Sequence, residues 1–72
     1  MSEVEKWERL ISMLVAYQLC RSIYRWNEVI LSALNIMLPE KWWAIVEVYE
    51  HDSKKLLKWA QKCLEKARGQ RP

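Results

Sequence analysis

Pro39 is the one proline inside this chain, and it is the residue that most constrains the fold. Proline lacks a backbone N–H and suits the first turn of a helix, while the residue before it avoids the α region. The chain of 72 residues has a single glycine, Gly69, and its other proline is the last residue. So few turn-forming residues argue against a loop-rich or disordered chain, and they predict helices that meet just before Pro39.

Apolar residues recur at helical spacing on both sides of this boundary. They include Val4, Trp7, Leu10, Ile11 and Leu14 near the start and Leu56, Leu57, Ala60, Cys63, Leu64 and Ala67 near the end. The spacing predicts an all-α fold, a small bundle of three to four helices at about 3–26, 28–38, 40–51 and 53–68. Residues 1–68 would form one helical domain and residues 69–72 a frayed C-terminal tail.

Capping residues support these helix starts. Ser2 and either Asp52 or Ser53 are suitable N-caps, and Gly69 is a suitable helix stop. Asn27 leaves two alternatives open, because it either ends one helix and caps the next or lies within a continuous helix. A continuous helix from Ser2 to Leu38 would be about 55 Å long and would demand oligomerisation to cover it. We expect the break at Asn27.

The stretch KWWAIVEVYE after Pro39 alternates in a way that also suits a strand. A helix explains it better, because Trp42, Ile45, Val46 and Tyr49 then share one face. The chain also offers no second strand for pairing, and a lone strand is unstable. We therefore expect a helix in which Trp42 faces the core and Trp43 lies at the rim.

The apolar content is high for so short a chain. It reaches 51% and includes five tryptophans, which are enriched at protein interfaces. Between Leu10 and Cys20 the helix is apolar almost all round, and from Val15 to Leu34 the polar residues form only a narrow stripe. These stripe residues are Gln18, Arg21, Arg25, Glu28, Ser32 and Asn35. A helix with two apolar faces packs against two things, one of which we expect to be another subunit.

Our first functional hypothesis is therefore a protein–protein interaction or structural subunit. It would form a homo-oligomer or dock in a larger complex through apolar, Trp-rich helix faces. The predicted interface residues are Trp7, Leu10, Met13, Tyr17, Trp26 and Trp43.

Charge is divided unevenly along the chain and suggests a second hypothesis. Residues 53–72 carry seven basic residues and one acidic residue, whereas residues 1–52 carry five basic and eight acidic residues. The basic helix could contact nucleic acid non-specifically through phosphates, or it could be only a solvated face. Its candidate contacts are Lys54, Lys55, Lys58, Lys62, Lys66 and Arg68. A helix–turn–helix, an anionic membrane surface and an acidic groove are further alternatives for this helix.

The sequence predicts no catalytic chemistry. His51 is the one histidine, and the pair Glu47 and His51 supplies at most two metal ligands on one helix. The single glycine excludes a glycine-rich phosphate loop. We expect no metal, no cofactor and no enzymatic activity.

The expected location is cytoplasmic. Cys20 and Cys63 are far apart in the chain, and the opening MSEVEKWERL is charged, unlike a secretory leader. These features favour two free, buried thiols over a disulfide. No apolar run reaches the 18 to 20 residues or so of a transmembrane span.

A third hypothesis is an artificial or engineered helical bundle. The two cysteines, the adjacent tryptophans and Asn27 are unusual choices for an idealised design, however.

Overall fold

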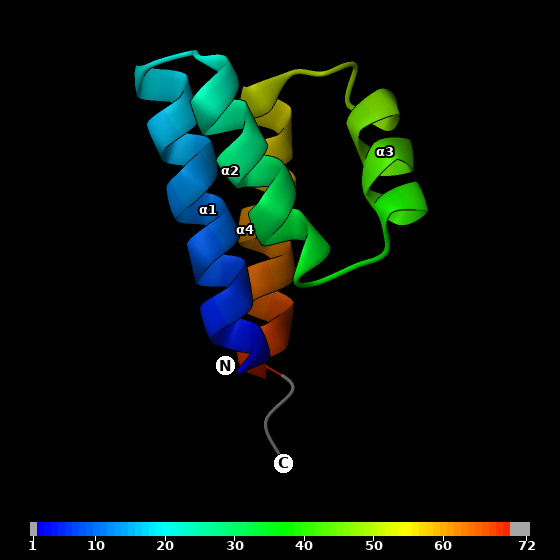
Figure 1. Ribbon diagram of the computed structural model, residues 1–72. Coiled ribbons are helices and arrows are strands. Elements are labelled where there is room, and N and C mark those ends of the chain that lie inside the picture. The colour runs from blue at the N-terminus through cyan, green and yellow to red at the C-terminus, as the bar shows by residue number, and fades with distance from the viewer. Residues whose placement is uncertain (1, 70–72) are drawn as a thin grey trace.

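The computed structural model describes residues 2–69, which form four helices and no strand (Figure 1). The helices are α1 (Glu3–Leu19), α2 (Ile23–Leu34), α3 (Pro39–Val48) and α4 (Ser53–Gly69). They run alternately up and down, with α1, α2 and α4 side by side and α3 standing next to α2 (Figure 1). The expected all-α bundle is confirmed.

The first helix is shorter than expected, and the predicted break at Asn27 is wrong. Helix α1 ends at Leu19, and Ser22 begins α2 by accepting a hydrogen bond on its Oγ from the backbone N–H of Arg25 at 3.2 Å. Ser22 has extended backbone angles, φ −134° and ψ 160°, as an N-cap requires. The break therefore lies at residues 20–22, so α2 folds back along α1, and Asn27 lies exposed within α2.

The other helix starts follow the local signals. The Oγ of Ser2 accepts from the backbone N–H of Glu5 at 3.2 Å, and Asp52 caps α4 by accepting from the N–H of Lys54 at 2.9 Å. Pro39 occupies the first turn of α3 after the extended residue Leu38. Three expected ends move: α2 stops at Leu34 rather than 38, α3 stops at Val48 rather than 51, and α4 continues through Gly69. The rest of the predicted tail, 70–72, lies outside the described residues.

The turn between α3 and α4 uses two left-handed residues without a glycine. Glu50 has φ 56° and His51 has φ 59°. The N–H of His51 donates to the carbonyl of Val46 at 3.0 Å, and the N–H of Glu50 donates to the carbonyl of Glu47 at 2.9 Å. This bond pair is a Schellman motif, in which the position of Glu50 is usually taken by glycine because a Cβ is strained there.

All four helices contribute to one core. Its buried apolar residues are Trp7, Leu10, Leu14, Val29, Ala33, Trp42, Val46, Leu56 and Ala60. Aromatic contacts connect the helices in sequence around this core: Tyr17 with Trp26, Trp26 with Trp42, Trp42 with Trp59, and Trp59 with Trp7. The fully buried indole of Trp42 thus attaches the short helix α3 to α2 and α4.

Candidate protein-interaction surface

The predicted interface residues occupy different environments. Leu10 is fully buried and Trp7 is nearly so, and both therefore belong to the core of the single chain. Met13, Tyr17 and Trp26 are partly buried, whereas Trp43 is 46% exposed. The structure thus places Trp42 in the core and Trp43 at the rim, as the helical phase predicts.

Aromatic packing explains why several of these residues turn inward. The ring of Trp7 lies 5.4 Å from that of Trp59 in an edge-to-face arrangement, which joins α1 to α4. The ring of Tyr17 lies 5.2 Å from that of Trp26, which joins α1 to α2. Edge-to-face and tilted contacts at these distances stabilise aromatic pairs beyond the burial of their area. Several aromatic side chains that were predicted to contact a partner therefore pack against other rings of the same chain.

The exposed apolar surface lies instead on the outer side of α2. Tyr24 is 80% exposed and Leu31 is 64% exposed, and the partly covered Leu34 follows at 39%. Their spacing of seven and three residues places them on one face of the helix, which also includes Asn27. We call this set, Tyr24, Asn27, Leu31 and Leu34, the outer face of α2.

The opposite side of α2 is apolar as well. Val29 and Ala33 are fully buried there, and Trp26 packs against the core. Helix α2 has 12 residues and is apolar on both sides. One side packs in the core of the chain, and the other side remains exposed to solvent.

Ser32 shows how the packing differs from the expected polar stripe. The sequence places Ser32 with Glu28 and Asn35 on the solvent side, but the structure buries Ser32 to 5% exposure. Helix α2 is rotated so that this part of the stripe faces α1, and the rotation turns Leu31 outward. The spacing of Tyr24, Leu31 and Leu34 could have predicted which side of α2 faces outward. That prediction requires the start of the helix to be placed at Ser22.

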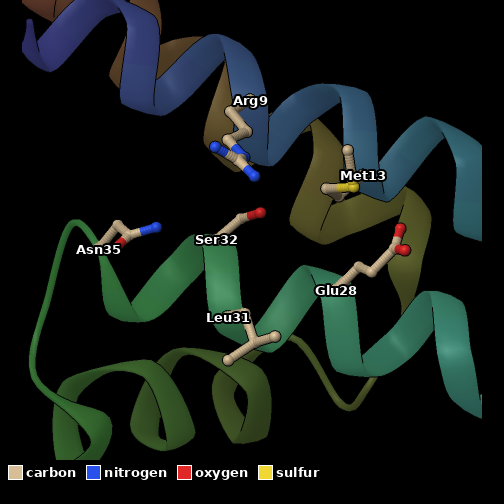
Figure 2. A pocket seen from close by; sticks show the side chains of 6 residues that line it. All are labelled: Arg9, Met13, Glu28, Leu31, Ser32 and Asn35. Atoms are coloured by element: carbon tan, nitrogen blue, oxygen red, sulfur yellow. The ribbon is translucent and has the colours of Figure 1, made fainter. Parts of the chain in front are cut away.

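A groove between α1 and α2 borders the outer face (Figure 2). Its volume is about 190 Å³, and the residues that line it are Arg9, Met13, Glu28, Leu31, Ser32 and Asn35. Arg9 and Asn35 lie at one end with Ser32, and Met13 and Glu28 lie at the other (Figure 2). Among residues 2–69 the one ion pair joins Arg68 to Glu8 at 3.2 Å, so neither Arg9 nor Glu28 has an ionic partner within this part of the chain.

Further exposed apolar side chains lie near both ends of α2 and on α3. They are Val15, Leu19, Ile23, Leu38 and Val48. Leu19 and Ile23 flank the turn that enters α2, and Leu38 follows its end. Apolar exposure is therefore not confined to the outer face of α2.

The basic residues predicted to contact nucleic acid are all exposed on α4. The five lysines, Lys54, Lys55, Lys58, Lys62 and Lys66, form no ion pair with residues 2–69. Arg68 differs because its guanidinium pairs with Glu8 of α1, with both side chains about half exposed. A pair this exposed contributes little to stability.

Neither cysteine is in a disulfide, and their surroundings differ. Cys20 is exposed in the turn after α1, which corrects the expectation of a buried thiol. Cys63 lines an apolar cavity of about 420 Å³ with Trp7, Trp59 and Ile45 among its neighbours. Burial raises the pKa of the Cys63 thiol, and the nearby charges of Lys66 and Lys41 oppose that rise.

Within residues 2–69, no three side chains of the metal-binding types histidine, cysteine, aspartate and glutamate come together as a metal site would require. None of the helices in this same range combines the length and the hydropathy needed to cross a membrane.

Comparisons of the chain with protein-family models, with curated proteins and with solved structures found no match. The outer face of α2 and the adjoining groove are the features with the clearest functional geometry.

Proposed function

We propose that this protein is a non-enzymatic interaction module that associates through the outer face of α2. The observation that supports this proposal is the orientation of α2, which buries Ser32 while it leaves Tyr24 and Leu31 exposed. Burial of apolar surface stabilises by roughly 25 cal/mol per Å², so a partner that covers this face would gain that free energy. Contiguous exposed apolar surface with a polar rim is typical of protein interfaces.

The groove supplies that polar rim. Arg9, Glu28 and Asn35 are exposed and lie on the α1 side of Leu31, so a bound partner would meet two charges and an amide beside an apolar centre. Trp43, at the rim of α3, remains a predicted contact of the same kind. The predicted cytoplasmic location is compatible with this role and remains a prediction.

The test is to replace Leu31 by aspartate. A charge in the middle of the outer face should weaken association by about tenfold or more, because burying an unpaired carboxylate is unfavourable. Molar mass from sedimentation at micromolar concentration and binding of an apolar fluorescent dye measure the effect, and circular dichroism should show unchanged helicity. Val48→Asp is the matched control, since Val48 is also exposed but lies on α3.

Two results would contradict the proposal. One is a wild-type protein that stays strictly monomeric and binds no apolar dye. The other is a Leu31→Asp variant that associates as the wild type does.

A second candidate function is non-specific binding of nucleic acid by α4. The observation in its favour is the set of five exposed lysines without an ion pair among residues 2–69. Contacts with phosphates would make binding weaken steeply with salt and depend little on base sequence. The double variant Lys58→Glu and Lys62→Glu should then lose binding, whereas Lys41→Glu on α3 should retain it. Binding that is equal at low and physiological salt would remove this candidate.

A further inference from the structure

We propose that the partner on the outer face of α2 is a second copy of this chain, in a two-fold symmetric dimer. The two α2 helices would pack antiparallel, with Leu31 of both copies beside the symmetry axis. This inference rests on the proposed function and adds the identity of the partner and the register of the contact. A two-fold axis makes an interface self-complementary, so both halves of each contact must be present on one chain.

The apolar contacts satisfy this requirement. An axis at Leu31 places a residue that precedes it opposite the residue equally far after it in the second copy. Because α2 ends at Leu34, Tyr24, seven positions before Leu31, then lies against the turn that follows α2 in the second copy, and this turn contains Leu38. Both side chains are well exposed in the single chain, at 80% and 73%. Together with the two copies of Leu31, they give a row of apolar contacts along the interface.

The polar residues of the face fit the same register. Asn27, four positions before Leu31, faces Asn35 of the second copy, four positions after it, and both are exposed. Two side-chain amides can donate to and accept from each other. Sliding one copy by a helical turn would place Asn27 opposite Leu31 and leave the amide without a partner, at a cost of about 1–3 kcal/mol. The asparagines thus favour one register, as buried asparagines do in coiled coils.

The charges identify the second copy as the partner. Arg9 and Glu28 lie at opposite ends of the groove, and neither has an ionic partner within residues 2–69 (Figure 2). The two-fold axis keeps the α1 side of one copy beside the α1 side of the other and reverses the direction of α2. Glu28 of the second copy therefore arrives at the end of the groove that holds Arg9 and Asn35. Two symmetric ion pairs, each between Arg9 and Glu28 of the other copy, result.

The size of the surface sets the expected affinity. Stable interfaces cover about 800 Å² on each partner, roughly a sixth of the 5200 Å² that this chain exposes. A helix of 12 residues reaches that area only with Leu38 and the α1 side of the groove included. We therefore expect a reversible dimer with a dissociation constant in roughly the micromolar range.

The test exchanges the two charges between chains. Arg9→Glu leaves two carboxylates facing each other in its dimer, and Glu28→Arg leaves two guanidinium groups, so each variant alone should dimerise about tenfold or more weakly. An equimolar mixture restores both opposite-charge pairs, but only across an interface between the two variants. Sedimentation of each variant and of the mixture should show monomers separately and a heterodimer together. Glu47→Arg, an exposed charge reversal on α3, is the control and should dimerise as the wild type does.

Three outcomes would overturn the inference. A mixture that stays monomeric like its components would mean that Arg9 and Glu28 act within one chain. Single variants that dimerise like the wild type would exclude the Arg9–Glu28 pairs and this two-fold arrangement, while the proposed function would still be decided by Leu31→Asp. A wild type that is monomeric at all concentrations but binds apolar dye through Leu31 would exclude a second copy and point to a different protein partner.

Discussion

The indole ring of Trp42 lies 6.2 Å from that of Trp26, and this contact packs α3 against α2. Helix α3 has only 10 residues and stands to one side of the three longer helices (Figure 1). Trp42 is fully buried and also reaches Trp59 of α4, with ring centroids 6.4 Å apart. One side chain therefore fills the space between three helices.

We predict that Trp42→Ala unfolds the chain or removes α3 from it. Loss of a fully buried tryptophan side chain costs about 3–5 kcal/mol, because the cavity it leaves cannot collapse completely. A single core in a domain of this size supplies on the order of 5 kcal/mol in total. Thermal unfolding followed by circular dichroism should lose its cooperative transition or show a much lower midpoint.

Trp43→Ala is the matched control, since the same atoms are removed one residue away. Trp43 is 46% exposed, and its loss should cost less than about 1 kcal/mol of folding stability. Equal destabilisation by the two changes would show that both tryptophans belong to the core.

We predict that Glu50→Gly stabilises the protein by about 0.5–1 kcal/mol. Glu50 has φ 56°, where a Cβ is strained, and glycine relieves this strain at some cost in unfolded-state entropy. Chemical denaturation should show a higher midpoint with an unchanged slope. Glu50→Ala removes the same charge but keeps the Cβ, so it should not stabilise. A gain from alanine equal to the gain from glycine would contradict the role of the backbone and point to charge.

We predict that Ser22→Ala destabilises the protein by about 1 kcal/mol. The Oγ of Ser22 accepts from the backbone N–H of Arg25, one of the free N–H groups in the first turn of α2, and alanine has no acceptor for it. Ser12→Ala in the exposed middle of α1 is the control and should be neutral or slightly stabilising, since alanine is the better helix former there. The midpoint of thermal unfolding measures both. Equal effects from the two serines would refute the cap.

Local signals were sufficient to predict three of the four helix starts to within one residue, but not most of the helix ends. Pro39 can only begin a helix, and Asp52 has no competitor other than its neighbour Ser53. The break between the first two helices was predicted at the wrong place. Two residues that can cap a helix, Ser22 and Asn27, lie five positions apart on the same apolar stretch. Local propensity does not choose between them. The choice depends on which break lets α2 pack along α1, and that is a property of the whole fold.

The interaction surface was predictable only in kind. The high apolar content correctly predicted that some apolar side chains would stay exposed. The individual residues were wrong, because Trp7 and Leu10 were predicted at the interface and Ser32 in the polar stripe, whereas all three are buried. The rotation of α2 about its axis decides these placements, and a helix that is apolar on both sides gives no local preference for one rotation. Trp42 and Trp43 were separated correctly because α3 has only one apolar face.

We predict that the thiols of Cys20 and Cys63 react at very different rates. Cys20 is exposed, whereas Cys63 is partly buried in an apolar cavity that raises its pKa and so lowers its thiolate fraction at neutral pH. Alkylation followed by mass spectrometry should label Cys20 about tenfold faster or more. A Cys20→Ser variant should then be labelled only slowly in the folded state and rapidly in denaturant. Equal labelling rates in the folded wild type would show that Cys63 is not shielded.

The same burial makes the folding stability depend on pH in one direction. Because the pKa of Cys63 is higher in the folded than in the unfolded chain, its contribution is constant while both states hold the proton. Above the ordinary thiol value of 9.0, the unfolded chain releases its proton first, so stability falls as pH rises. Cys63→Ala should lose less stability than the wild type between neutral pH and a pH above 9.0, as measured by the thermal midpoint of each. Cys20→Ser serves as the reference, and a Cys63→Ala variant with the wild-type pH dependence would contradict the burial of this thiol.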